Sequence, residues 1–125
     1  LARPPLFLPT VAPHYKGMLV SVPLPRDLLT RTVGAQELVA LLAERYEGES
    51  CVEVIRPDGR AALEDGFLHP EACNDTNRVE LLVFGDAPEL LLVARLDNLG
   101  KGAGGAAVQN LNLMLGADEF AGLTC

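Results

Sequence analysis

The chain has 125 residues, of which 49% are hydrophobic, and this is enough for one domain with a sizeable core. Its formal net charge of −7 argues against nucleic acid or an acidic membrane surface as a partner. It contains no apolar run long enough to span a membrane, and its proline-rich first residues lack a signal-peptide pattern. We therefore expect a single domain over residues 1–125.

Three cysteines, Cys51, Cys73 and Cys125, occur at irregular spacing and without a C-x-x-C motif. This pattern favours reduced thiols in the cytoplasm over a disulfide framework. No group of cysteine, histidine and acidic residues has the spacing of metal ligands, so we expect no metal site.

The first half of the chain predicts an extended segment, a strand and a helix. Residues 1–16 hold four prolines and predict an extended segment. Residues 17–24 predict a strand, which Pro23 and Pro25 end or place at a sheet edge. Residues 35–46 predict a helix that covers a sheet, because an apolar stripe recurs at helical spacing. The stripe consists of Leu38, Leu41, Leu42 and Tyr46, with Val39 beside it.

The second half of the chain predicts three more strands. Residues 51–55 are rich in β-branched side chains and predict the first of them. After a loop over 61–77, the apolar runs 79–84 and 90–96 are separated by a short polar turn. These two runs predict a central antiparallel hairpin.

A glycine-rich turn and a second helix close the chain. The helix is predicted from an apolar stripe at Ala107, Val108, Leu111, Met114 and Leu115, with Gly116 as its stop. Four strands and two helices predict an α+β fold, a two-layer sandwich whose mixed or antiparallel sheet is covered by helices.

Glycines are concentrated where the last helix should begin, at Gly100, Gly102, Gly104 and Gly105. Each costs about 0.5–1 kcal/mol relative to alanine inside a helix, so something must approach this backbone closely. It is either another part of the protein or a ligand. A helix N-terminus next to Lys101 suits an anion, but the spacing matches neither a dinucleotide-binding motif nor a P-loop. Both alternatives stay open on spacing alone.

Residues 97–103 and 106–112 resemble the C-terminal signature of the N-acetyl-gamma-glutamyl-phosphate reductases, which belong to the semialdehyde dehydrogenase superfamily and act in arginine biosynthesis. Residues 7–9 with 15–20 resemble the segment that opens the substrate and dimerisation domain in the shorter form of that enzyme. Residues 76–78, leading into a strand, are a third and weaker match. The matches fall in the family's order.

The resemblance implies the C-terminal domain of a glyceraldehyde-3-phosphate dehydrogenase-like enzyme, a homo-oligomer whose nucleotide-binding domain lies upstream of this chain. It implies that NADPH reduces an acyl phosphate, N-acetyl-glutamyl 5-phosphate, to the semialdehyde through a cysteine thioester. The family's Gly-Cys nucleophile and its His-x-His-x-Pro-Glu base are both absent from this sequence. We therefore expect no catalytic residue here, and an inactive chain in isolation.

The resemblance also suggests binding residues. Lys16, followed by Gly17, is a cation at a position that the family often fills with Arg, Lys or Gln, and it could hold a phosphate or carboxylate of the substrate. The alternative is an exposed lysine at a strand start. Asn98, Lys101 and Gly102 are expected beside the cofactor, although an Asp-Asn pair also fixes turns by itself.

Other polar residues are weighed against simpler roles. Cys73 lies near His69 in sequence, but an incidental pair in a loop is favoured over a nucleophile and its base. His14 is predicted to be a solvated loop residue. Gln109 and Asn110 are either interdomain contacts or the polar face of the last helix.

Two alternatives to the reductase remain. The chain could be a non-catalytic ligand-binding or dimerisation module, since fold does not fix function. It could also come from a related enzyme such as the aspartate semialdehyde dehydrogenase, against which residues 109–112 argue by resemblance. An upstream nucleotide-binding motif and a Gly-Cys motif would favour an enzyme.

Overall fold

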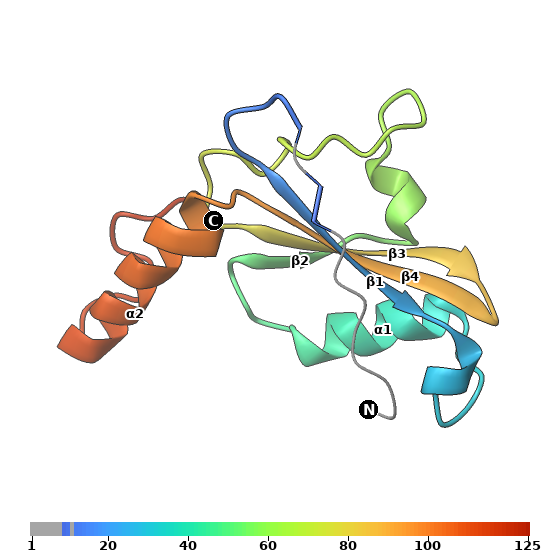
Figure 1. Cartoon of the computed structure of the whole chain (residues 1–125). Coiled ribbons are helices and arrows are strands. Elements are labelled where there is room, and N and C mark those ends of the chain that lie inside the picture. Colours follow the sequence, from blue (N-terminus) through green and yellow to red (C-terminus); the bar gives the residue numbers. More distant parts are fainter. Residues whose placement is uncertain (1–8, 11) are drawn as a thin grey trace.

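A four-stranded sheet in the order β1-β4-β3-β2 is the frame of the molecule (Figure 1). The computed structural model describes residues 9–10 and 12–125. β1 (Met18–Leu24) and β3 (Val79–Asp86) both pair antiparallel with the central β4 (Glu89–Leu96), and β2 (Val52–Val54) pairs parallel with β3. The sheet is therefore mixed, and the predicted central hairpin is confirmed as β3 and β4.

Helix α1 (Ala35–Arg45) covers one face of the sheet. Its Val39 is buried and packs with Val83 and Leu90 of the hairpin to form the core on this face. Each such side chain contributes about 1.5–3 kcal/mol when fully buried. Leu38 and Leu42 of the predicted stripe pack against this core with Val39 at its centre, whereas Leu41 is 57% exposed.

The loop between β2 and β3 covers the opposite face. It begins with a short 3-10 helix, η2 (Gly59–Ala62), whose first residue lies against the Phe84 ring. A Cβ atom at Gly59 would lie 2.5 Å from that ring, so any larger residue there would require the ring to move. Deeper under the loop, Glu80 and Arg95 form a buried ion pair across β3 and β4, and Arg95 also donates to the carbonyl of His69.

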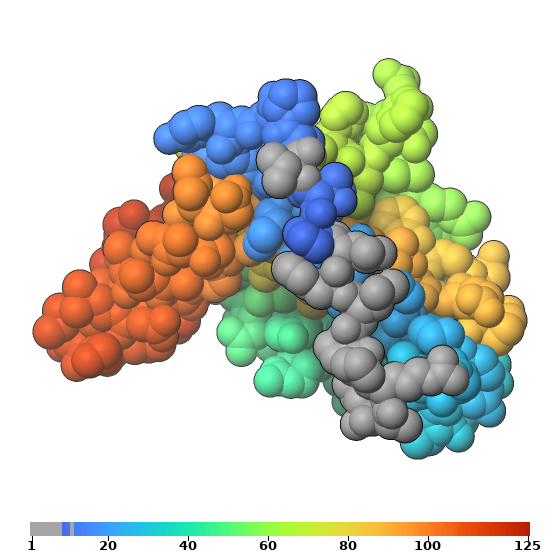
Figure 2. Space-filling view, viewed as in Figure 1, coloured from blue at the N-terminus to red at the C-terminus, as the bar shows by residue number. Residues whose placement is uncertain are grey.

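The glycine-rich turn forms a π-helical segment, η3 (Gly100–Gly104), that runs directly into α2 (Gly105–Leu115). Gly116 ends α2 in the left-handed conformation, as predicted. α2 does not lie on the sheet but projects beyond the end of the sheet at which β4 finishes, and Figure 2 shows it as a separate lobe. The two-layer sandwich is therefore confirmed, with α1 as its covering helix.

The C-terminal tail returns from α2 to the start of β2. The carbonyl of Thr124 accepts a hydrogen bond of 2.6 Å from the backbone N–H of Asn77, and Cys125 forms a disulfide with Cys51. The expectation of reduced thiols is therefore wrong for these two cysteines. The pairing joins residues 74 positions apart through the path of the tail, which no local pattern in the sequence specifies. Cys73 is free and buried.

Within residues 9–10 and 12–125, no helix is long and apolar enough to cross a bilayer.

Candidate functional site

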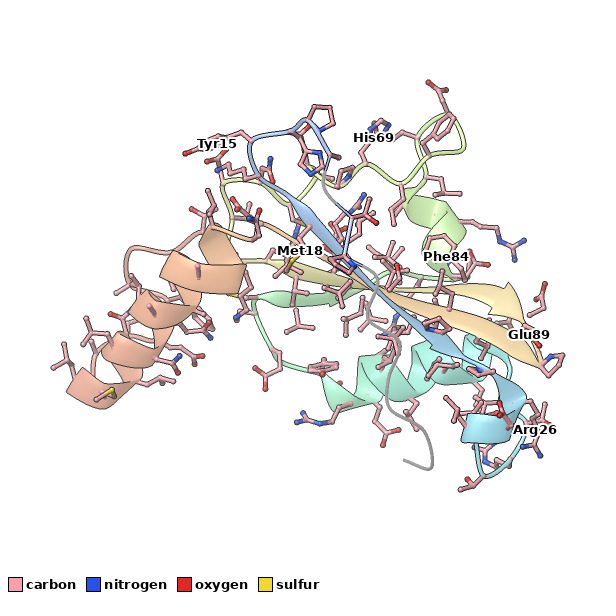
Figure 3. All side chains as sticks on the ribbon, in the orientation of Figure 1. Tyr15, Met18, Arg26, His69, Phe84 and Glu89 are labelled. Atoms are coloured by element: carbon pink, nitrogen blue, oxygen red, sulfur yellow. A yellow bond between two sulfur atoms is a disulfide. The ribbon has the colours of Figure 1, made fainter. Side chains whose placement is uncertain are left out.

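Two of the predicted binding segments meet where β1 begins and β4 ends. The β1–β4 ladder ends at the pair Met18 and Leu96, and the chain beyond each strand continues the contact through side chains. Asn98 Oδ1 accepts a hydrogen bond of 2.7 Å from the backbone N–H of Gly17, although the two residues are 81 positions apart. Tyr15 and Met18 mark this segment in Figure 3.

A second contact runs beside the first. Lys16 Nζ lies 3.1 Å from Asp97 Oδ2 and 2.5 Å from Asp75 Oδ1. The structure thus brings together five residues from three segments, which we call the strand-end cluster. It consists of Lys16, Gly17, Asp75, Asp97 and Asn98.

Gly17 is required by its backbone. Its φ of +112° is a conformation that side chains rarely adopt, and a Cβ atom there would lie 2.7 Å from the carbonyl oxygen of Pro70. Asn74 holds the same turn from the other side by donating from Nδ2 to the carbonyl of Lys16, over 3.3 Å. The Lys-Gly pair therefore has a structural explanation that does not involve a ligand.

Asp97 is the buried centre of the cluster and was not singled out by the sequence analysis. Its carboxylate accepts hydrogen bonds from the backbone N–H groups of Asp75 at 2.9 Å, Leu99 at 2.9 Å and Gly100 at 3.0 Å. Burial alone would raise the pKa of Asp97, but these N–H groups and the Lys16 ammonium lower it to about 2. Its position immediately before a helix start was the sequence signal for such a capping role.

The anion expected at the helix start is thus the chain's own. Asp97 occupies the N-terminal end of η3 with a carboxylate, which satisfies the free N–H groups there. Two of the glycines are explained by contacts within the chain: a Cβ atom at Gly100 would lie 2.7 Å from the Thr76 carbonyl oxygen, and one at Gly105 would lie 2.3 Å from the side-chain Oδ1 of Asn77. For these two positions the approaching group is another part of this chain.

Gly102 differs from those two glycines. It is exposed, and the nearest atom to an added Cβ would be the Asp97 carbonyl oxygen at 3.4 Å, an ordinary contact. Its own N–H donates to that carbonyl over 2.9 Å. The packing of the described chain does not require a glycine at 102, so an approaching ligand or domain stays a prediction there.

Lys101 is half-buried and belongs to a polar network centred on Gln109 of α2. Its Nζ donates to Gln109 Oε1 over 2.7 Å, and the same oxygen accepts from Asn77 Nδ2 over 3.0 Å. Gln109 in turn donates to Glu119 in the tail over 2.7 Å. Gln109 therefore ties α2 to the tail and to the start of β3.

Lys16 has two carboxylate partners, and the hydrogen bond that it donates to Asp75 is the main reason that its pKa is raised. Its side chain is 18% exposed, whereas that of Asp75 is 85% exposed and that of Asp97 only 2%. Two carboxylates around one ammonium leave a formal charge of about −1, which by itself repels an anionic substrate. Substrate binding by Lys16 stays a prediction.

The remaining candidates do not form a reactive pair. Cys73 is completely buried, and burial raises the pKa of its thiol, with Glu80 adding to the effect. His14 contacts the carbonyl of Gly17 through Nε2 at 3.3 Å. In the part of the chain that the structure describes, no group of three His, Cys, Asp or Glu residues could hold a metal ion.

A shallow groove of about 450 Å³ lies between α1 and β2, at the sheet edge that β2 forms. Glu44, Glu47 and Glu53 line it together with Arg56, Tyr46 and alanine and valine side chains. None of the residues that line the groove belongs to the matched motifs, whereas the strand-end cluster contains Lys16, Gly17 and Asn98, so the cluster remains the candidate site.

Comparison with known proteins defines the class of this fold. The family model of the semialdehyde dehydrogenase dimerisation domain matches residues 2–98, and the chain belongs to that family. It is 51% identical to N-acetyl-gamma-glutamyl-phosphate reductase 2 of Nostoc sp., over 98% of this chain and 39% of that protein. It is 45% identical to the N-acetyl-gamma-glutamyl-phosphate reductase of Burkholderia ambifaria, over 93% of this chain and 37% of that protein.

A third relative, N-acetyl-gamma-glutamyl-phosphate reductase 2 of Pseudomonas putida, is 42% identical over 94% of this chain and 37% of its own length. The chain therefore spans about two fifths of the length of the curated relatives that it matches. The resemblance drawn from the sequence motifs is confirmed at the level of the family.

Proposed function

We propose that this chain is the substrate-side and dimerisation part of an enzyme that reduces N-acetyl-glutamyl 5-phosphate to N-acetyl-glutamate 5-semialdehyde in arginine biosynthesis. The observation that carries the proposal is the identity of 42–51% with proteins of that name over nearly the whole chain. Among the described residues, Cys51 and Cys125 are paired in a disulfide and the free Cys73 is buried, so no exposed thiol is available as a nucleophile. The nucleophile and base of the proposed reaction therefore come from an upstream domain.

NADPH is the proposed cofactor, and when bound it supplies the hydride. The residues around η3 fit such a group: Gly102 is exposed and open to an approaching surface, and Lys101 uses one of its three N–H groups on Gln109. Asn98 uses its carbonyl oxygen to hold Gly17 and would offer its NH2 group. We propose that Asn98, Lys101 and Gly102 face the cofactor.

Lys16 and Gly17 are proposed to face the substrate. An ammonium has three N–H groups, and the two carboxylate partners of Lys16 leave one for a phosphoryl or carboxylate oxygen of the substrate. Because the side chain of Asp75 is exposed, it is the partner that an incoming anion could displace. Asp97 keeps the ammonium in place from the buried side.

The proposed partners are a second copy of the protein and the upstream nucleotide-binding domain. The family description names a dimerisation domain, which implies a homo-oligomer. α2 offers the apolar surface for the other domain, because its Leu111 and Met114 are 51% and 83% exposed. A cytoplasmic location is also proposed, in keeping with the free thiol of Cys73.

The test is the activity of the full-length gene product. It would be supplied with N-acetyl-glutamate semialdehyde, phosphate and NADP⁺ while NADPH absorbance is followed. We expect turnover that disappears when the upstream cysteine is replaced, and no turnover from residues 1–125 alone. A folded full-length protein that turns over only the aspartate semialdehyde would identify the related dehydrogenase, and one without either activity would identify a non-catalytic module.

A further inference from the structure

Asp97 collects its hydrogen-bond donors from three segments that are far apart in the chain. Lys16 belongs to the segment before β1, Asp75 to the loop before β3, and the N–H groups of Leu99 and Gly100 to the start of η3. The residue itself is 1% exposed. A single buried carboxylate thus joins the proposed substrate side of the cluster to its proposed cofactor side.

A second buried carboxylate shows what an ordinary structural pair looks like in this domain. Glu80 is 4% exposed and accepts from Arg95 at 2.7 Å and from Arg78 at 3.1 Å. Arg95 lies on the neighbouring strand and Arg78 directly before β3, so Glu80 stays within the sheet. It resembles Asp97 in burial and charge but reaches neither the segment before β1 nor η3.

We propose, building on the function proposed above, that Asp97 is a positioning residue that fixes the substrate-binding Lys16 relative to the cofactor-side helix start. The two oxygens of its carboxylate have different partners. Oδ1 accepts from Leu99 and Gly100, whereas Oδ2 accepts from Asp75 and contacts Lys16. One oxygen therefore caps η3 while the other holds the substrate-side segments, and the rigid carboxylate sets the distance between them.

Substitutions separate the two halves of this arrangement. Asp97→Asn keeps one oxygen for the helix start but places an NH2 group against the N–H of Asp75 and the Lys16 ammonium, so that donors face donors. Asp97→Ser keeps a capping hydroxyl for η3 and loses the reach to Lys16. Glu80→Gln is the matched control, since it also removes a buried charge.

The kinetic experiment uses the full-length protein, with kcat and KM measured for phosphate and for NADP⁺. We expect Asp97→Asn and Asp97→Ser to lower kcat/KM for phosphate by about 10²-fold, the scale of a small misplacement of reacting groups. Glu80→Gln should lower the melting temperature at least as much and leave kcat/KM within a few fold of the wild type. Wild-type kinetics in a folded Asp97 variant, or an equal kinetic loss in Glu80→Gln, would overturn the proposal.

Hydrogen exchange supplies a readout that does not depend on activity. In Asp97→Ser, amide exchange should become faster at 75 and in 14–17 while that of 99–102 stays near the wild-type rate. Unchanged exchange at the amide of 75 would contradict the link through Asp97. A full-length protein that turns over no acyl phosphate would refute the proposed function, and the exchange pattern would then still decide whether Asp97 joins the segments.

Discussion

Gly17 shows how a binding-motif residue can be required by the fold itself. Gly17→Ala would force a side chain into a φ of +112° and against the Pro70 carbonyl. We expect a loss of about 1–3 kcal/mol in the free energy of unfolding, measured by chemical denaturation. Gly48→Ala is the control, because Gly48 also has a positive φ, of +83°, but nothing lies within 4 Å of an added Cβ. Equal losses in both variants would show that crowding at Pro70 contributes nothing.

Asp97 makes the stability of the domain depend on pH in the acid range. Its pKa is lowered to about 2 in the folded state, so its contribution is fully present above the unfolded value, near 3.8. The contribution is lost as the pH falls from about 5 through 2 and amounts to on the order of 2 kcal/mol. Acid titration of unfolding should therefore show a shallower decline for Asp97→Asn than for the wild type. Parallel curves would contradict this assignment.

At the scale of elements, the glycines of η3 and of the start of α2 divide into two kinds. Gly105→Ala should destabilise the fold, because its Cβ would meet Asn77 Oδ1 at 2.3 Å. Gly102→Val should leave the fold intact but weaken NADP⁺ binding by the full-length protein, since it crowds the exposed side of the helix start. Denaturation and cofactor titration of both variants check the division. Unchanged NADP⁺ affinity and turnover in Gly102→Val would remove Gly102 from the proposed cofactor surface.

The sequence predicted the strands and both helices because their signals are local. Runs of apolar and β-branched residues specified β3 and β4, and a helical repeat specified α1. The contact between Lys16 and Asp97 was not predictable, although both lie in the matched motifs, because it depends on how the ends of β1 and β4 meet. The Cys51–Cys125 disulfide was missed for the same reason, since the path of the tail decides it.

At the scale of the whole molecule, the two helices have different surroundings. α1 buries Val39 in the core beneath the sheet, whereas no residue of α2 is buried. α2 is held by polar contacts to the tail, such as those from Asn112 Nδ2 to the carbonyls of Glu119 and Ala121, each 3.0 Å long. A helix whose apolar stripe contains no buried residue suits contact with a further domain.

Leu111 and Met114 provide the test of that contact. Both lie on the exposed stripe of α2, and burial of each against the upstream domain would contribute about 1.5–3 kcal/mol. Leu111→Glu with Met114→Lys, which adds no net charge, should lower the melting temperature of the full-length protein and make the junction between the domains more sensitive to proteolysis. Leu41→Glu on α1, at a position 57% exposed, is the control for an apolar surface residue outside this stripe. If the double variant and the control are equally stable and equally resistant to protease, then α2 does not carry the interface between the domains.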